Sequence, residues 1–376
     1  MKRNIYLDNN ATTPVDPQVI QAIHEALNND FGNPSSIHSF GQESRQQLLA
    51  ARDRVANYLK VKPTEICFVS SGTEAMNMLI RGVIATQPDA HIISSNVEHS
   101  AVYQTLQSLE KQGYKVSYLP TGLAGAVDPD QVQQAIQKDT KLITLMAVNN
   151  ETGVKTDLEK IAAIAEAHQI PFIVDGVALL GKTLFSIPDG LSAMGFSGHK
   201  IHGPKGIGFA FIRSRLKLTP FITGGDQEYG RRGGTENMPG ILGLAKAIEC
   251  LEASLPEASL HMKQLRDLFE TLLLKNLSGV VINGQGIRIE NTSNLAFEGV
   301  DGESLLRLLN QEGVAASHGS ACSSGALEPS RVLINMGIPL KVVRSSIRFS
   351  MSRMNTREEI ESAAAIITNC VNKLSH

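Results

Sequence analysis

The sequence predicts an α/β protein in which helices cover both faces of a mostly parallel sheet, followed by a smaller α+β domain. Through the first two thirds of the 376 residues, short apolar runs alternate with segments that have the 3.6-residue period of amphipathic helices. After about residue 250, a long amphipathic helix leads into a shorter series of strands and helices. The first pattern is typical of βαβ units, and the second is typical of a smaller α+β domain.

The strands expected in the first part are short and almost continuously apolar, as strands covered on both faces are. They span residues 65–71, 91–96, 114–120, 141–148, 170–175 and 206–212. Amphipathic helices are expected between several of these strands, over residues 74–85, 101–113 and 157–169. Because helices fill the connections, successive strands can run parallel within one sheet.

The elements expected in the second part begin with the long helix over residues 261–277. Strands then follow over residues 279–284, 292–297 and 345–350, with a helix over residues 303–313. No Gly/Ser-rich linker separates the two parts of the chain. We therefore expect the boundary between them to be a helix rather than a flexible hinge.

Composition and charge are those of an ordinary globular protein. The 35 basic and 37 acidic residues give a formal net charge of −2, which predicts neither nucleic-acid binding nor attachment to a membrane surface. No apolar run approaches the roughly 20 residues that cross a bilayer, and the first residues lack the apolar core of a signal peptide. These features predict a cytoplasmic protein.

The four cysteines, Cys67, Cys250, Cys322 and Cys370, are widely scattered. Such scatter favours reduced thiols over a disulfide framework, in agreement with a cytoplasmic location. The sequence contains no CxxC or HExxH spacing, so no metal site is expected.

The segment Ser-Ser-Gly-Thr-Glu-Ala, residues 70–75, joins an expected strand to an expected helix. Ser71 and Glu74 have the spacing of a capping box, which on its own indicates only a well-capped helix. The unpaired N–H groups of a helix start also attract phosphate, which Gly72 would let approach closely and Thr73 could bind through its hydroxyl. A Walker A loop is excluded, because no Lys-Ser/Thr pair follows.

Asp175 ends the expected strand over residues 170–175, at the edge where open α/β sheets bind ligands. A carboxylate there can keep a pyridine nitrogen protonated, although aspartate at a strand end is also a common turn former. Lys200 and Lys205 follow in the glycine-rich segment 195–206, and spacing alone does not choose between them. Only about one lysine in 2,500 is neutral at pH 7, so covalent chemistry needs surroundings that lower its pKa.

Cys322 and Arg348 lie in the second part of the chain. Small and polar residues surround Cys322 and would leave its thiol accessible, although a tight loop that happens to contain a cysteine has the same composition. Arg348 lies on the polar side of an expected strand. Its guanidinium could bind a carboxylate through two hydrogen bonds, although most strand arginines are simply solvated.

Taken together, these segments resemble the cysteine desulfurases of the NifS/IscS type, which are pyridoxal 5'-phosphate (PLP) enzymes of fold type I in the class-V aminotransferase family. The resemblance runs from end to end, in order, over YLDNNATTPVDP, FGNPSSIHSFG, SSGTEAMN, VEHSAV, VNNETGV, SGHKIHGPKG, RRGGTEN, GSACSSG and SSIRFS. It implies a large PLP-binding domain, residues 15–255, with a mostly parallel seven-stranded sheet. It also implies a small α+β domain, residues 1–14 and 256–376, that carries the Cys322 loop and Arg348.

The resemblance also implies how PLP is held. Lys200 corresponds to the lysine that bonds covalently to the cofactor, and Asp175 corresponds to the partner of its ring nitrogen. His99 corresponds to the imidazole stacked over the pyridine ring, and Asn150 to a side chain near the cofactor and the substrate. The contacts on the phosphate side correspond to Gly72, Thr73, Ser197, His199 and, from the partner subunit of a homodimer with shared active sites, Thr235.

The implied reaction is the removal of sulfur from L-cysteine. Arg348 corresponds to the clamp for the substrate carboxylate, and Cys322 to the nucleophile that accepts the sulfur as a persulfide while L-alanine is released. The catalytic residues are thus implied to be Lys200, Cys322 and His99. The sulfur would then pass to an iron–sulfur scaffold or a sulfur-carrier protein.

The chain departs from the family pattern at several positions. Ala178 stands three residues after Asp175, where the family has a glutamine that hydrogen-bonds the cofactor. We expect the cofactor still to bind, with a shifted pKa and colour of its bond to the lysine. His318 replaces a serine, which we interpret as a tolerated substitution, with assistance to proton transfer as the alternative. Asp226 and Gly233 replace a glycine and a serine without an assignable consequence.

Two rival interpretations of the chain need a test. One is another PLP enzyme of the same fold, such as a selenocysteine lyase or an aminotransferase, of which the aminotransferase has no need for the Cys322 loop. The other is a degenerate, non-catalytic partner in sulfur transfer, which Ala178 makes conceivable. This second interpretation is opposed by the intact Lys200, Asp175, Cys322 and Arg348.

Overall fold

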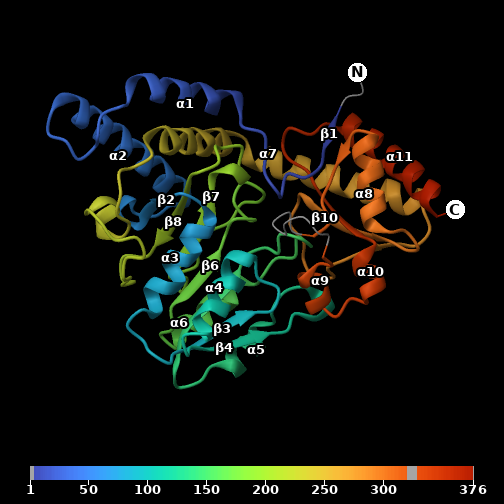
Figure 1. Ribbon diagram of the computed structural model, residues 1–376, viewed down its shortest axis with the longest axis horizontal. Helices are drawn as coiled ribbons and strands as arrows, with labels where there is room; N and C mark the ends of the chain where they lie inside the picture. The colour runs from blue at the N-terminus through green and yellow to red at the C-terminus, as the bar shows by residue number, and fades with distance from the viewer. Residues whose placement is uncertain (1–3, 320–327, 376) are drawn as a thin grey trace.

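The structure is a computed structural model that describes residues 4–319 and 328–375. Figure 1 shows a larger body, which contains the long central sheet, and a smaller body formed mainly by the C-terminal part of the chain. Helix α7 (Met238–Asn276) runs from one body into the other. Among the described helices, none combines the length and the apolar character that crossing a membrane would require.

The larger body is built on a seven-stranded sheet. Its strands lie in the order β2 (Ile66–Val69), β8 (Gly208–Ile212), β7 (Ala193–Ser197), β6 (Phe172–Asp175), β5 (Thr140–Met146), β3 (His91–Ser95) and β4 (Lys115–Leu119). The strands from β7 to β4 pair in parallel, and β8 runs antiparallel to both of its neighbours. The α/β class and the mostly parallel sheet predicted from the sequence are confirmed.

Helices cover both faces of this sheet, because neighbouring side chains of a strand point to opposite faces. On β6, Ile173 packs in one apolar core with α3 and α4, whereas Phe172 and Val174 pack in another core on the opposite face. The first face carries α3 (Gly72–Ile84) and α4 (Ser100–Glu110). The second face carries α1 (Pro17–Asn29), α2 (Ser39–Leu59), α5 (Pro129–Ala135), α6 (Leu158–Ala167) and the first half of α7.

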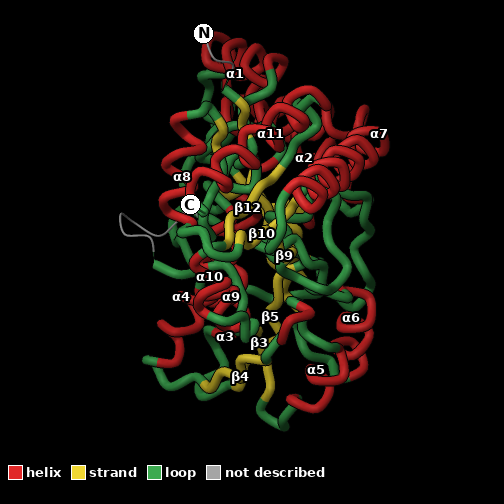
Figure 2. Tube along the Cα trace, turned by 90° about the vertical axis from the view of Figure 1, so that its right-hand side faces the viewer, coloured by secondary structure: helices red, strands yellow, loops and turns green. Residues whose placement is uncertain are grey.

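The smaller body has its own sheet and its own core. Its antiparallel strands lie in the order β12 (Ser346–Ser350), β10 (Thr292–Phe297) and β9 (Val280–Ile282), which Figure 2 shows side by side. A parallel pair joins β1 (Ile5–Tyr6) to β11 (Val314–Ala315). The apolar residues of these strands pack against α8 (Gly302–Gln311), α11 (Arg357–Leu374) and the second half of α7.

Helix α7 contributes to the cores of both bodies. Residues 241–255 include apolar side chains of the larger core, and residues 265–273 include those of the smaller core. The helix contains Pro256 and begins already at Met238, well before the helix expected over residues 261–277. The predicted boundary between residues 255 and 256 therefore falls inside this helix, and the division into two domains remains a prediction.

A small apolar cluster also connects the two bodies next to α4. Val97 of the larger body packs against buried residues of α9 (Arg331–Asn335) and α10 (Leu340–Arg344), among them Val332 and Leu333. Arg331 reinforces this contact by donating hydrogen bonds to the backbone carbonyls of Asn96 and Glu98. The segment that leads into α4 is therefore held from both sides.

Candidate active site

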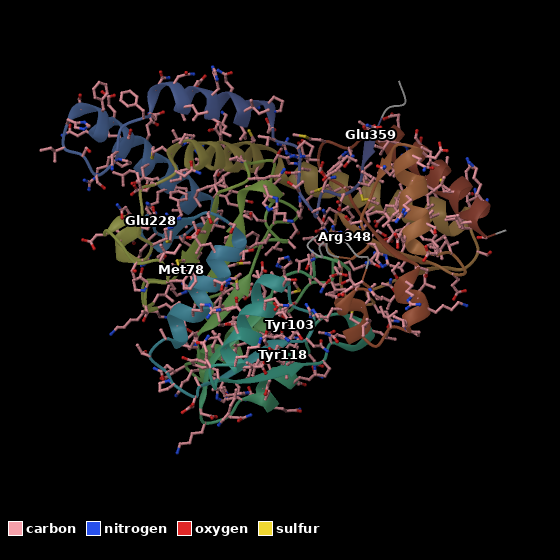
Figure 3. The ribbon with its side chains drawn as sticks, in the orientation of Figure 1. Met78, Tyr103, Tyr118, Glu228, Arg348 and Glu359 are labelled. Carbon is pink, nitrogen blue, oxygen red and sulfur yellow. The ribbon has the colours of Figure 1, made fainter. Side chains whose placement is uncertain are left out.

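A cavity lies where the carboxyl ends of the parallel strands meet the smaller body. Most of the side chains predicted to act together line it, namely Gly72, Thr73, His99, Asn150, Asp175, Ser197, His199, Lys200 and Arg348. They come from the starts of α3 and α4, from loops at the ends of β5, β6 and β7, and from β12. Figure 3 shows Arg348 between the two bodies.

The start of α3 forms one wall of this cavity. Ser71 Oγ accepts a hydrogen bond from Glu74 N–H at 3.1 Å, as expected for a helix cap, but Glu74 Oε2 accepts from Ser70 N–H rather than from Ser71 N–H. A Cβ at Gly72 would lie 2.6 Å from Cγ2 of Val177. Only glycine leaves room at this point for the helix start to sit directly behind the cavity.

Asp175 ends β6 and lies buried at the cavity. Its Oδ1 accepts a hydrogen bond from Val177 N–H at 3.0 Å. Burial raises the pKa of Asp175, an effect that the neighbouring His99 and Lys200 partly offset. A buried carboxylate of this kind is stabilised in its ionised form by a ligand that brings an N–H group or a positive charge.

Lys200 ends a short 3₁₀ turn, η3 (Gly198–Lys200), directly after β7. Its Nζ donates hydrogen bonds to the backbone carbonyls of Asn10 and Ala11, the latter at 2.9 Å. Asn10 is itself held by a hydrogen bond from its N–H to Ser350 Oγ at 2.8 Å. The amine of Lys200 therefore lies at the cavity, whereas Lys205 is exposed in the turn that follows.

The two predicted histidines are both held in defined orientations. His99 is the N-cap of α4, where its Nδ1 accepts a hydrogen bond from Ala101 N–H at 3.1 Å, so the proton of a neutral ring is on Nε2. His199 Nδ1 lies 3.2 Å from Thr12 Oγ1. Burial, followed by the charge of Lys200, lowers the pKa of His199 to about 4, so its ring is neutral near pH 7.

Arg348 is buried on β12, with only 1% of its surface exposed. Its Nη1 donates to the Asn150 carbonyl at 3.0 Å, and its Nη2 forms an ion pair with Asp8 Oδ1 at 2.9 Å. Among the described residues, no group accepts from its Nε, and none donates to Asn150 Oδ1. The protein thus fixes the orientation of Arg348 and leaves its Nε–H available to a ligand.

Two of the predicted residues are not among those that line the cavity. Thr235 is exposed and lines a separate cavity with Arg232 and other residues. Cys322 lies outside the described residues. The nearest described residues that flank it, Gly319 and Glu328, line a second cavity that shares His99 with the first.

The two main departures from the family pattern have clear surroundings. Ala178 lines the cavity with a methyl group, which can donate no hydrogen bond. His318 is tied to the smaller body, because its Nδ1–H donates to the Ser346 carbonyl at 2.6 Å. This hydrogen bond gives His318 an anchoring contact, and a role in proton transfer stays a prediction.

Sequence reasoning missed four contributions to the site. The carbonyls of Asn10 and Ala11 and the carboxylate of Asp8 belong to the segment YLDNNATTPVDP, which was an available signal but offered no individual role. Lys182 also lines the cavity. Nothing in the local pattern of the sequence sets Lys182 apart from a surface lysine that follows an apolar turn.

The comparison with known protein families identifies the class of protein to which this fold and cavity belong. The profile of the family described as aminotransferase class-V matches residues 5–362, so the chain belongs to the class-V aminotransferase family. Enzymes of this family use PLP. The fold is therefore that of the PLP-dependent transferases of type I, as the resemblance implied.

Within this family, the chain is similar to cysteine desulfurases. It is 41% identical to cysteine desulfurase IscS of Dictyoglomus turgidum, over 100% of this chain and 96% of the relative. It is 42% identical to a cysteine desulfurase of Trichormus azollae, over 98% of this chain and 93% of the relative. The solved structure of a NifS-like protein superposes with a TM-score of 0.92 at 34% identity, over 99% of this chain and 100% of the other.

The residues of the cavity fit a PLP molecule. Ser197 Oγ and Asn150 Oδ1 are buried without a hydrogen-bond partner among the described residues, so a polar ligand would satisfy them. The helix start at Gly72, which carries no side chain, suits a phosphate, and the buried Asp175 suits a protonated ring nitrogen. Lys200 supplies the amine that an aldehyde requires.

Proposed function

We propose that this chain is a cysteine desulfurase that uses PLP to move the sulfur of L-cysteine onto Cys322, with release of L-alanine. The observation that carries the proposal is the convergence of Lys200, Asp175 and Arg348 on one cavity, in a chain 41% identical to a cysteine desulfurase over its full length. The Cys322 thiol loses its proton and forms an S–S bond with the substrate sulfur. The C–S bond of the substrate breaks, and the carbon that carried the sulfur gains a proton.

The cavity residues would hold the cofactor at its two ends. Gly72, Thr73, Ser197 and His199 would bind the phosphate, and the neutral ring of His199 offers a hydrogen bond without a second charge. Asp175 would keep the ring nitrogen protonated. When bound, PLP withdraws electrons from the α-carbon of an attached amino acid.

Lys200 would link the cofactor covalently and also move the proton. As a free neutral amine it can take the proton from the substrate α-carbon, because it lies at the same cavity. The carbonyls of Asn10 and Ala11 then stabilise the ammonium that results, since both already accept hydrogen bonds from Nζ. The same amine can return the proton to the product carbon.

The substrate would be oriented from the other side by Arg348 and Asn150. The Arg348 Nε and the Asn150 Oδ1 are buried polar atoms at the cavity that find no hydrogen-bond partner among the described residues. A carboxylate can accept from the former, and an ammonium group can donate to the latter. His99, whose Nε2 carries the proton in a neutral ring, would lie against the cofactor and assist at the substrate sulfur.

A homodimer with shared active sites completes the proposal. Thr235 is exposed and does not line the cavity of its own chain, which suits a residue that binds the phosphate in a partner subunit. Phe31, Ile37 and Phe40 give the region between α1 and α2 an exposed apolar surface of the kind that oligomers cover. An iron–sulfur scaffold or a sulfur carrier is the proposed acceptor, and the widely scattered cysteines of the sequence suit the reducing cytoplasm.

The test supplies the purified chain with PLP and L-cysteine and measures alanine and sulfide together, with a thiol reductant present. Both products should form in equal amounts. Lys200→Ala should lower the rate by about a thousandfold or more, with loss of covalent cofactor attachment. Cys322→Ala should keep the bound cofactor but lose sulfide, whereas the matched control Cys250→Ala should keep both.

The same measurements separate the rival functions. An aminotransferase would transfer an amino group at an unchanged rate in the Cys322→Ala variant. A selenocysteine lyase would release selenide from selenocysteine but little sulfide from cysteine. A chain that remains colourless when PLP is added would be the non-catalytic partner, and the proposed activity would then be wrong.

A further inference from the structure

Lys182 is a second buried lysine at the cavity, and neither the proposed mechanism nor the sequence pattern gives it a role. Only 3% of its surface is exposed. Its Nζ donates a hydrogen bond to the backbone carbonyl of Lys200 at 3.0 Å. It thus contacts the very residue whose amine is expected to react.

A turn after β6 brings Lys182 to this position. The N–H of Lys182 donates to the Leu179 carbonyl, and Gly181 has a φ of +76°, the left-handed conformation that glycine adopts without strain. A Cβ at Gly181 would lie 2.7 Å from Cγ2 of Ile201, the residue directly after Lys200. The backbone just before Lys182 is therefore packed against the Lys200 segment, which brings Nζ of Lys182 to the Lys200 carbonyl.

The charge of Lys182 has no carboxylate partner. Within residues 4–319 and 328–375, no acidic side chain forms an ion pair with it. The groups that face it are Lys200 of η3, His202 in the following turn, and Arg353 after β12. Asp16, an acid that faces His202 and Arg353, is already paired with Arg353 at 2.5 Å.

We propose that Lys182 is a positioning residue for Lys200: it holds the Lys200 backbone through its hydrogen bond, and its positive charge weakens the binding of a proton by the Lys200 amine. The inference rests on the proposed function, because it assigns Lys200 the reacting amine. A neutral Lys200 is what both covalent attachment and proton removal require.

The electrostatics of the pair support this role. Burial, then the charge of Lys200 and that of Arg353, lower the pKa of Lys182 to about 7. The repulsion is mutual, so a proton on either amine makes a proton on the other less favourable. Two amines in one buried pocket therefore hold fewer than two protons near neutral pH.

The location of Lys182 also argues against a purely structural role. A buried cation without an anion destabilises a folded protein, whereas an apolar side chain of similar length would fill the same space without this cost. Groups that cost stability are typical of functional sites. The hydrogen bond to a single carbonyl stabilises the folded protein by less than burial of the charge destabilises it.

The test measures the proton affinity of Lys200 in the apo form of the full chain. Competitive labelling with acetic anhydride across a pH series, read by peptide mass spectrometry, gives the pKa of each lysine. Lys182→Met and Lys182→Gln should raise the pKa of Lys200 by about one unit, a tenfold tighter hold on the proton. Lys182→Arg, which keeps a positive charge at every pH of the series, should leave the Lys200 pKa at or below the wild-type value.

The control is Lys205→Gln, which removes an exposed positive charge from the same segment and should change the Lys200 pKa much less. In the PLP-loaded enzyme, Lys182→Met and Lys182→Gln should also raise the pH at which the absorption spectrum changes. Because Lys182→Gln can keep a hydrogen-bond donor, it decides the question even if Lys182→Met folds poorly.

An unchanged Lys200 pKa in folded Lys182→Gln and Lys182→Met would overturn the inference. The labelling needs neither PLP nor cysteine, so its result does not depend on desulfurase activity. A chain that fails to release sulfide from cysteine but shows the shift would contradict only the proposed function. An active desulfurase without the shift would contradict only the role of Lys182.

Discussion

Two buried cations of the larger body, Arg52 and Lys182, differ in their partners, because Arg52 is paired with a carboxylate and Lys182 is not. Arg52 forms two hydrogen bonds with the Glu228 carboxylate, at 2.8 and 2.6 Å, and a third with the Ile66 carbonyl. Its guanidinium also lies over the ring of Phe68. Lys182 has one backbone carbonyl and, among the described residues, no acid.

The difference separates a charge that stabilises the fold from one that serves the site. Burial lowers the pKa of Arg52, but the hydrogen bonds and the charge of Glu228 outweigh it and raise that pKa overall. For Lys182 nothing outweighs burial. Figure 3 places Glu228 near the outer edge of the larger body, away from Arg348 at the cavity. The paired cation is thus remote from the chemistry, and the unpaired one adjoins it.

The largest effect is expected from breaking the remote pair. Glu228→Gln leaves Arg52 charged and buried, and we expect it to lower the free energy of unfolding by about 3–5 kcal/mol. Urea denaturation at pH 7 measures this change. The double variant Arg52→Met with Glu228→Gln should recover part of the loss, because no isolated charge remains. Equal losses in the single and double variants would show that packing rather than charge dominates.

A smaller effect of opposite sign is expected at Lys182. Lys182→Met should raise the free energy of unfolding by about 2 kcal/mol at pH 7. The pKa of Lys182 is about 7 in the folded protein and 10.5 for the unperturbed side chain, so the unfolded chain binds more protons between these values. Wild-type stability from this group therefore rises with pH across that window, by up to about 1.4 kcal/mol per pH unit.

The difference in free energy of unfolding between Lys182→Met and the wild type should accordingly shrink as the pH rises from 7 to 10. Urea titrations of both proteins at several pH values measure this trend. An advantage that stays constant with pH would show that Lys182 is already neutral in the folded protein, and the contrast with Arg52 would lose its electrostatic basis.

The smallest effect is expected at Glu98, a buried acid beside His99. Burial raises the pKa of Glu98 to about 8, and a hydrogen bond from Ser95 at 2.5 Å offsets part of the effect. Between pH 4.5 and 8 the folded protein binds more protons than the unfolded chain, so stability from this group falls as the pH rises. Glu98→Gln should remove that fall, a gain of about 1 kcal/mol at pH 8. Thermal unfolding at pH 5 and pH 8 measures the difference.

The strands and helices that the sequence predicted are those with strong local patterns. The expected strand over residues 170–175 contains β6, and the expected helix over residues 157–169 contains α6, because continuous apolar runs and a 3.6-residue period are set by local side chains. Strand β7, with glycine at its centre, had no such pattern. Its five residues are buried through contacts with β6 and β8, which are set by tertiary packing.

The site was predictable where a side chain belongs to a motif and not where a backbone or a distant turn contributes. Asp175 and Lys200 lie at the ends of strands, where the position of a ligand follows from the topology. The carbonyls of Asn10 and Ala11 act through the backbone, which any residue supplies. Lys182 depends on a left-handed glycine and on packing against Ile201, and neither can be inferred from its neighbours in the sequence.

Helix α7 has a mechanical consequence for the cavity. Because its two halves are embedded in different cores, the smaller body cannot tilt toward the sheet without bending the helix itself. Pro256 lies between the two embedded halves and offers no backbone N–H, so a bend there breaks the fewest hydrogen bonds. The distance between Arg348 and the edge of the large sheet therefore depends on how far α7 bends at Pro256.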